Sequence, residues 1–423
     1  MEQSTLAIII LVVTLICYGI PKIPLSVTTI LAVLAMAGTG IIKYNQAFSG
    51  FSNSVIFLVA GLMVIGKATV TTGLAQRIGG LLGRGRLGKN ETLFMMSLFV
   101  LSAFVSAFVN ASLTVAILMP VIDAVVLQSD GVITRKDNYM VLGISSVLGN
   151  NILTIGATSM LTAVSLLDAS GYGHMGILVP AAVNLPAVIV VALIFLFFGK
   201  KLQHSWFDFP DIPVAAGGKE KEDLSMKPVW KQWLVAIDLI VVVIALIANV
   251  NYALAALLGA SVLVLAGCLS EKEAYGSVSW GTIVIVAGAI GFSSAIQASG
   301  AGKVIADFFV TASGPLGTTG FGLCIVLFFV STLLSNVMSD NATVAIMLPI
   351  AMAIAASTGF NPVPLFLATC SGTKVGLATP ICVAPMTQIG VAGYRFKDYL
   401  RLGGLVNIVC MIVTCICINF IYF

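Results

Sequence analysis

Long apolar runs, separated by short polar stretches, follow one another along almost the whole chain. Each of the simpler runs is about as long as the roughly 20 residues that a helix needs to cross the hydrocarbon of a bilayer. The pattern therefore predicts an all-α polytopic membrane protein. The runs lie at 5–20, 23–42, 52–74, 92–128, 139–167, 175–199, 232–249, 252–269, 279–298, 317–357, 362–393 and 400–421.

Two runs, 92–128 and 317–357, are too long for one span and carry polar residues at their centres. Asparagine and aspartate are costly in mid-membrane unless the backbone turns there and lines a polar cavity. We therefore predict two re-entrant hairpins, which leaves ten spanning segments. The tips of the hairpins are Asn110-Ala111-Ser112 and Ser339-Asp340-Asn341.

Two further runs, 139–167 and 362–393, contain glycine, proline or hydroxyl residues at mid-span, which break the helical hydrogen-bond ladder. Carbonyls freed by such a break can coordinate a cation, and a helix N-terminus beside it can hold an anion. We therefore predict two discontinuous helices that meet the hairpin tips. Their polar positions include Gly149, Asn151, Thr154 and Thr158 in the first run, and Thr379 and Pro380 in the second.

The two halves of the chain resemble each other. Residues 114–120 read TVAILMP and residues 343–349 read TVAIMLP. Each half holds five predicted spans, an odd number, so we predict that the second repeat is inverted relative to the first. The first repeat is 1–199, a cytoplasmic linker is 200–231 and the second repeat is 232–423. Inverted repeats with broken helices are typical of secondary transporters.

Composition and charge predict the orientation. The 423 residues are 59% hydrophobic and 9% charged, whereas a typical soluble protein is about 25% charged, so soluble enzyme folds are excluded. Of the 21 lysines and arginines, 17 lie in one set of alternate loops, two in the other set, and Lys67 and Lys374 lie within apolar runs. By the positive-inside rule, we expect a multi-pass protein of the plasma membrane (the inner membrane of a bacterium) with both termini outside.

At these residues the chain resembles the divalent anion/sodium symporter (DASS) family of the ion transporter superfamily. The resemblance rests on the hairpins with their exit prolines Pro120 and Pro349, the two broken helices and the tail 394–399. Members of that family carry a serine-asparagine-threonine triplet at each hairpin tip, which contacts substrate carboxylates and sodium ions. Here those positions read Asn110-Ala111-Ser112 and Ser339-Asp340-Asn341.

The resemblance also implies a homodimer in which a transport domain moves against a scaffold domain by an elevator mechanism. The glycine-rich segments 77–89 and 300–317 are candidates for the arm helices that connect the two domains. Sodium coupling is implied in the same way, and we expect no other cofactor.

Two lysines within apolar runs need an explanation, because a lysine at the centre of a bilayer costs roughly 2.5–3.5 kcal/mol. Our hypothesis is that Lys374 faces Asp340 across the second half-site, so that its ammonium replaces a sodium ion and alters the coupling. The alternatives are a structural ion pair, or a lysine that reaches the membrane interface. For Lys67, which lies among small residues, we expect snorkelling or a local pair.

We therefore expect a secondary active transporter of a small anion, either a di- or tricarboxylate or an inorganic oxyanion such as sulfate, and not an enzyme. The expected partners are this anion, the bilayer and a second copy of the chain. The predicted substrate contacts are Asn110, Ala111, Ser112, Thr158, Ser339, Asp340, Asn341, Thr379 and Pro380. The candidate sodium ligands are Asn110, Ser112, Gly149, Asn151 and Thr154.

Two other functions remain open at this point. A sodium/proton antiporter could use Asp340 as its titrating carboxylate, and a passive channel could also contain re-entrant hairpins. Residues 83–88 match the GxGxxG pattern, but no predicted strand precedes them, so neither a nucleotide nor a nucleic acid is an expected ligand. His174 and His204 stand apart from acidic residues in the sequence, so no metal site is predicted there.

Overall fold

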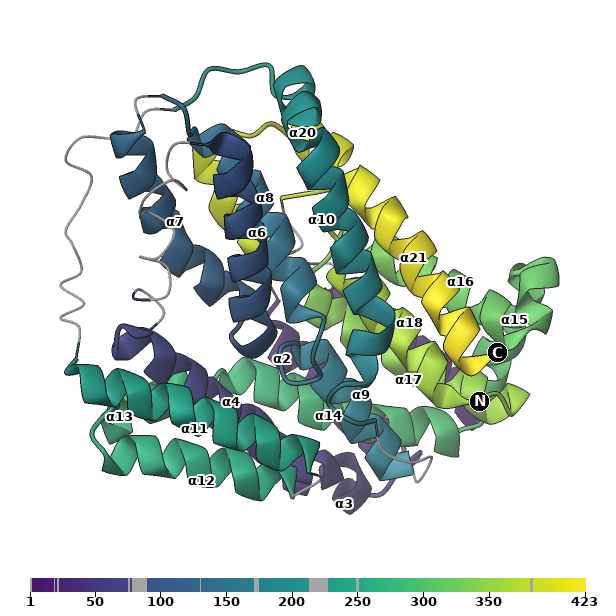
Figure 1. Ribbon diagram of the computed structural model, residues 1–423. Coiled ribbons are helices and arrows are strands. Elements are labelled where there is room, and N and C mark those ends of the chain that lie inside the picture. Colours follow the sequence, from purple (N-terminus) through teal and green to yellow (C-terminus); the bar gives the residue numbers. More distant parts are fainter. Residues whose placement is uncertain are drawn as a thin grey trace.

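The computed structural model describes residues 2–18, 20, 23–74, 77, 90–129, 131–170, 175–212, 227–248, 251–380 and 383–423. Its regular elements are helices, and the described residues contain no strand (Figure 1). The all-α fold class predicted from the sequence is therefore confirmed.

Described helices occur along the whole length of both halves of the chain. In the first half they are α1 (Gln3–Tyr18), α2 (Leu25–Gly38), α3 (Tyr44–Ala47), α4 (Ser54–Thr71), α6 (Glu91–Phe108), α7 (Ala111–Gln128), α8 (Arg135–Asn150), α9 (Thr158–Ser170) and α10 (Val179–Trp206). In the second half they are α11 (Val229–Ile247), α12 (Tyr252–Leu265), α13 (Glu271–Ser277), α14 (Trp280–Ala298), α15 (Ala301–Ala312), α16 (Gly320–Ser335), α17 (Asp340–Thr358), α18 (Pro362–Lys374), α19 (Ala384–Gln388), α20 (Phe396–Asp398) and α21 (Gly404–Tyr422).

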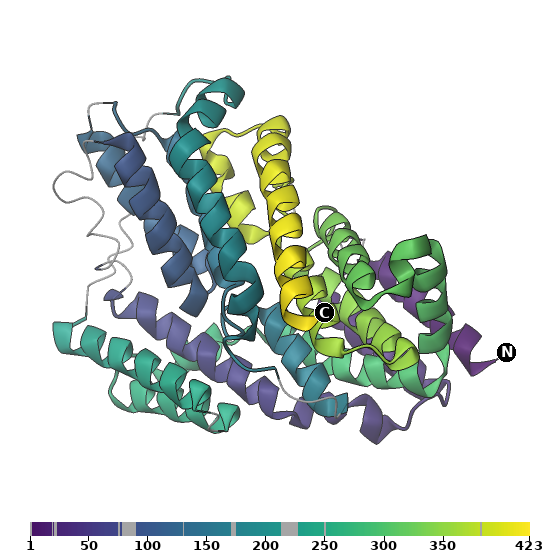
Figure 2. The same ribbon diagram turned by 45° about the vertical axis from the view of Figure 1, so that its right-hand side comes forward.

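Helix packing follows the same pattern in both halves. Helix α6 packs against α8 and α16 against α18, while α7 packs against α8 and α17 against α18. Helix α4 packs against α12, and α2 against α14. The long helices α10 and α21 lie side by side, as both views show (Figures 1 and 2). Of the two candidate arm segments, 301–312 is helix α15 and packs on α17, whereas 78–89 lies outside the described residues.

Several helices have the length and surface of membrane-crossing segments. Among the described residues, four are long and apolar enough by length and composition: Glu91–Phe108, Val179–Trp206, Asp340–Thr358 and Phe396–Tyr422. Large apolar side chains are exposed on the long ones, such as Phe197 on α10 at 72% and Phe420 on α21 at 84%. Such surfaces need lipid or another protein to cover them.

Each pair of helices that carries a polar centre in the sequence turns at that centre. Helix α6 ends at Phe108 and α7 begins at Ala111, with Asn110 as its N-cap: the Asn110 side chain accepts a hydrogen bond from the Ser112 amide at 2.9 Å. Ser339 caps α17 in the same way, since its hydroxyl accepts a hydrogen bond from the Ala342 amide at 3.3 Å. These polar residues satisfy backbone donors that the start of a helix leaves free.

Glycines let α8 and α18 approach the preceding helices closely. A Cβ atom at Gly149 would collide with the backbone of Ala103 on α6. A Cβ atom at Gly372 would lie 2.5 Å from the carbonyl oxygen of Phe328 on α16. Close backbone packing of this kind brings the ends of α8 and α18 next to the turns that follow α6 and α16.

Candidate functional site

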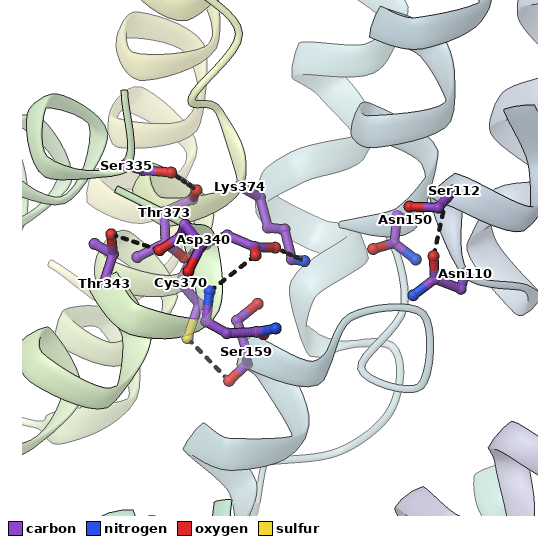
Figure 3. Close-up of polar contacts among 12 residues, drawn as sticks. Asn110, Ser112, Asn150, Ser159, Ser335, Asp340, Thr343, Cys370, Thr373 and Lys374 are labelled. Atoms are coloured by element: carbon purple, nitrogen blue, oxygen red, sulfur yellow. Dashed lines mark hydrogen bonds and ion pairs between the residues drawn. The ribbon is translucent and has the colours of Figure 1, made fainter. Parts of the chain in front are cut away.

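A small polar cavity lies where the two helix turns face each other. It has a volume of about 130 Å³. Figure 3 shows residues of the first half and of the second half on opposite sides of it. The lining residues are Asn110, Ala111, Ser112, Val147, Asn150, Asp340, Asn341, Lys374, Val383, Ala384 and Pro385.

An ion pair forms one wall of this cavity. The Nζ atom of Lys374 lies 2.5 Å from Oδ2 of Asp340, and the two side chains are 8% and 16% exposed. The other carboxylate oxygen of Asp340 accepts a hydrogen bond from the Asn341 amide at 2.8 Å. Asp340 opens α17 and Lys374 ends α18, so each charge has the sign that its helix end favours. The structure thus brings together the two charges that the sequence singled out.

Matching hydrogen bonds join the helix before each turn to the following broken helix, α6 to α8 and α16 to α18. The Ser106 hydroxyl donates to the Ser146 carbonyl at 2.5 Å, and the Ser335 hydroxyl donates to the Thr373 carbonyl at 2.5 Å. The next residues along the chain are Val147 and Lys374, and both line the cavity. An apolar side chain in the first half therefore takes the place that an ammonium takes in the second.

Asn150 organises the chain break in the first half. Its side-chain amide donates to the Ser106 carbonyl at 3.2 Å and also to the Gly156 carbonyl. The break extends from 151 to 157, between α8 and α9. The candidate site residues did not include Asn150, although the asparagine pair at 150–151 is the only sequence signal that could have indicated it.

Three of the candidate sodium ligands lie away from the cavity. Gly149 packs against α6, the Asn151 carbonyl accepts a hydrogen bond from the Asn184 side chain at 3.1 Å, and the Thr154 hydroxyl donates to the Gly176 carbonyl at 3.1 Å. Of the five candidates, Asn110 and Ser112 line the cavity. The side chain of Thr158 lies outside what the structure describes.

Several predicted substrate contacts in the second half instead form hydrogen bonds that fix the local backbone. The Thr379 hydroxyl donates to the Asn336 carbonyl at 2.9 Å, and the Pro380 carbonyl accepts a hydrogen bond from Thr387. Together with the N-cap Ser339, these residues shape the turn but do not line the cavity. Instead, the segment 383–385 lines it, which the sequence did not indicate because its side chains carry no polar group.

The broken helices of the two halves touch each other beside the cavity. The Cys370 thiol on α18 donates to the Ser159 carbonyl on α9, at 3.4 Å (Figure 3). Cys370 is fully buried, so this contact belongs to the packed interior.

A second, larger cavity of about 360 Å³ shares Asn110 and Ser112 with the first. It lies between α4, the turn at 108–113, the break at 155–156 and the segment before α14, and Lys67 lines it. In the part of the chain that the structure describes, Lys67 forms no ion pair or side-chain hydrogen bond. Of the two expectations for Lys67, the local pair is not found among the described residues, because α4 presents this residue to a cavity rather than to an acidic neighbour. Snorkelling stays a prediction.

The prediction that His204 stands apart from acidic residues is wrong. One ligand atom each of His204, Glu91 and Asp137 lies within 4.8 Å of the others, because the ends of α6, α8 and α10 converge. Glu91 forms an ion pair with Lys200 at 3.0 Å, and the Asp137 carboxylate accepts a hydrogen bond from Thr134. His174 lies outside the described residues.

Comparison with known proteins places these features in a family. A sequence model described as "Citrate transporter" matches residues 7–372 and 321–423. The chain is 32% identical over 189 residues to an uncharacterized transporter of Synechocystis, a match that covers 44% of this chain and 31% of that protein. It is 26% identical to sodium/sulfate cotransporter 1 of Chlamydomonas reinhardtii, over 38% and 18% of the two chains. With the chloroplastic dicarboxylate transporter 2 of spinach it shares 27% identity, over 62% and 50%. The matches thus span at most half the length of these three relatives.

Two solved structures share the fold. The YdaH transporter of Alcanivorax borkumensis is 13% identical with a TM-score of 0.61, and the match covers 99% of this chain and 98% of that one. Neisseria gonorrhoeae MtrF, which is described as one of a class of antimetabolite efflux pumps, is 17% identical with a TM-score of 0.59, over 98% and 95% of the two chains.

Proposed function

Because this chain belongs to the citrate transporter family, we propose that it is a secondary active transporter of a small anion. The observation that carries the proposal is the polar cavity between the two helix turns, which is lined by Asn110, Ser112, Asn341 and the Lys374–Asp340 pair. Relatives described as sodium/sulfate cotransporters and dicarboxylate transporters support an oxyanion or a carboxylate as the substrate. The family comprises membrane transporters and not enzymes.

The cavity offers the chemistry that such an anion needs. The side-chain amides of Asn110 and Asn341 and the hydroxyl of Ser112 can donate hydrogen bonds without adding charge. The Lys374 ammonium can turn from Asp340 to the anion, and Asp340 can recover it when the anion leaves. The pair therefore keeps the empty cavity neutral, while a bound anion gains a charge-assisted hydrogen bond.

The same pair bears on the proposed coupling. A built-in ammonium beside Asp340 does in the second half-site what a bound cation would otherwise do, so a sodium ion there is unnecessary. Val147 supplies no charge in the first half-site, where Asn110 and Ser112 line the cavity. We therefore place the single proposed sodium site in the first half. Coupling to sodium at that half is supported by the sodium/sulfate cotransporters among the relatives.

The proposed architecture is a pair of inverted repeats, 1–199 and 232–423, joined by the linker 200–231, with both termini outside. It is supported by the packing of α6 and α7 on α8, which matches that of α16 and α17 on α18, and by the matching hydrogen bonds of Ser106 and Ser335. The proposed transport domain contains the two turns and the broken helices. It moves against a scaffold that includes α4, α11 and α12, in a homodimer with an elevator mechanism.

A sodium/proton antiporter using Asp340 is the second candidate, because this carboxylate is 16% exposed and faces a cavity. An antiporter carboxylate has to exchange protons for sodium ions. Asp340 already holds the ammonium of Lys374 at 2.5 Å. This internal cation favours anion transport over antiport.

Uptake into proteoliposomes containing the purified protein tests the proposal. Labelled citrate, succinate and sulfate are supplied with an inward sodium gradient, with potassium in place of sodium, and with a proton gradient. We expect one class of anion to accumulate against its gradient. Failure of all three anions to accumulate, together with a change in lumenal pH when sodium alone is added, would instead establish the antiporter.

A further inference from the structure

The larger cavity beside Lys67 has the features of a ligand site of its own. Its volume of about 360 Å³ lies within the range of about 300–1,000 Å³ that small-molecule sites occupy. Next to the lysine, Gly66 faces open space, since a Cβ atom built there meets nothing within 4 Å. The lysine therefore stands beside an open volume.

The charge of Lys67 is not neutralised by a neighbouring acid. The charge of Lys67 acts on the carboxylate of Glu273 on α13. Hydrogen bonds from Ser270 lower the pKa of Glu273 most, and the charges of Lys227 and Lys67 lower it further. One carboxylate oxygen of Glu273 is already held by the amide and hydroxyl of Ser270, both at 2.7 Å. The ammonium thus faces the cavity without a salt-bridge partner among the described residues, and an anion there would offset its positive charge.

The cavity leads directly to the proposed substrate site. Asn110 and Ser112 line both this cavity and the smaller one that contains Lys374. A ligand held by Lys67 would therefore pass Asn110 and Ser112 of the first hairpin tip, which can donate hydrogen bonds, on its way to Lys374. Lys67 lies on α4, which packs against α11 and α12 and also contacts α9, the second part of the first broken helix.

We propose that this cavity is a second anion site, in which Lys67 captures the substrate at the face that the lysines and arginines mark as cytoplasmic, before it reaches the hairpin tips. This inference rests on the proposed function, because it takes the transported anion as the ligand. Since Lys67 is on the proposed scaffold and the tips are on the proposed transport domain, the site is complete only while the tips stand beside α4. Lys67 therefore serves the anion from one side of the membrane only.

Transport measured separately from the two sides tests the proposal. Lys67→Gln removes the charge and Lys67→Arg keeps it. Lys272→Gln removes an exposed charge on the nearby α13, at a residue that does not itself line the cavity. We expect Lys67→Gln to raise KM for the transported anion about tenfold from the cytoplasmic side, the equivalent of about 1.4 kcal/mol. KM from the opposite side, kcat and all parameters of Lys272→Gln should stay within twofold, and Lys67→Arg should restore most of the cytoplasmic affinity.

Salt dependence gives a second readout. The cytoplasmic KM of the protein should rise with ionic strength, and Lys67→Gln should flatten that rise, because screening acts on the charge that the variant lacks. If Lys67→Gln matches Lys272→Gln from both sides while anion uptake persists, the second site is wrong and the proposed function stands. If citrate, succinate and sulfate neither bind nor enter with the unchanged protein, the proposed function itself fails.

Discussion

At the scale of single residues, two lysines that look alike in the sequence have opposite environments in the structure. Both lie within apolar runs, but Lys374 is 2.5 Å from Asp340 and Lys67 opens onto a cavity. The partner of a lysine depends on which helix packs beside it. The pairing with Asp340, 34 residues away along the chain, arises because α18 returns along α17.

Removing one member of the ion pair should destabilise the protein more than removing both. Lys374→Gln leaves the Asp340 carboxylate buried without its counter-charge, at a cost of about 3–5 kcal/mol. The double change Lys374→Gln with Asp340→Asn should recover most of that loss. Thermal unfolding in detergent measures the effect, and both variants should lose anion uptake.

The control for this pair is Lys200→Gln, which breaks the pair with Glu91 by removing a lysine whose side chain is 44% exposed, against 8% for Lys374. An exposed ion pair contributes only about 0–1 kcal/mol, so the unfolding temperature should barely change. Equal unfolding temperatures for Lys374→Gln and Lys200→Gln would show that the Lys374–Asp340 pair does not hold the turn in place.

At the scale of helices, polar residues in apolar runs turn out to have two different tasks. Some of them cap a helix or close the backbone at a break, as Ser339, Thr154 and Thr379 do. Others face the cavity, as Ser112 and Asn341 do. The sequence marks where a helix is interrupted, but both tasks use the same residue types.

Glycine-mediated packing of α8 and α18 gives a prediction at this scale. Alanine at Gly149 or Gly372 would push α8 from α6 or α18 from α16, which should cost about 1–3 kcal/mol. The cavity residues would move with the displaced helix, so anion affinity should fall as well. Thermal unfolding and a binding titration with the transported anion measure the two effects.

Gly281→Ala on α14 is the matched control, because a Cβ atom there meets nothing within 4 Å. Alanine favours the helix over glycine by up to about 1 kcal/mol, so this variant should be neutral or slightly more stable. A destabilisation equal to that of Gly149→Ala would mean that the close helix contacts are not the cause.

At the scale of the whole molecule, two groups of helices stand out. Helices α4, α11 and α12 pack together, and α6, α7, α8 and α10 form a second group beside α21 (Figure 2). The segments 110–112 and 340–341 come from different halves of the chain, yet both line the same cavity. A site built from two halves can change its exposure when one group of helices moves against the other.

The distribution of lysine and arginine predicts which loops face the cytoplasm. In a cysteine-free background, Lys201→Cys should react with a membrane-impermeant maleimide only from the cytoplasmic side. Lys43→Cys should react only from outside, because Lys43 lies in the lysine-poor set of loops; both side chains are exposed. Labelling of intact and permeabilised cells measures this. Labelling of both variants from the same side would contradict the proposed topology.

The sequence by itself determined the helical class, the transporter family and the positions where helices are interrupted, because hydrophobic run length and polar residues in mid-run are local properties of the chain. It also identified Asn110, Ser112, Asp340, Asn341 and Lys374, which all line the cavity.

Only the tertiary structure decided which polar groups share a cavity and which form hydrogen bonds with the backbone instead. Asn150 and the segment 383–385 reach the cavity, and Lys67 opens onto a second one, because helices far apart in the sequence pack side by side. The same convergence brings His204 close to Glu91 and Asp137. Hydrogen-bond partners and open space are properties of such packing, and the pattern along one chain does not contain them.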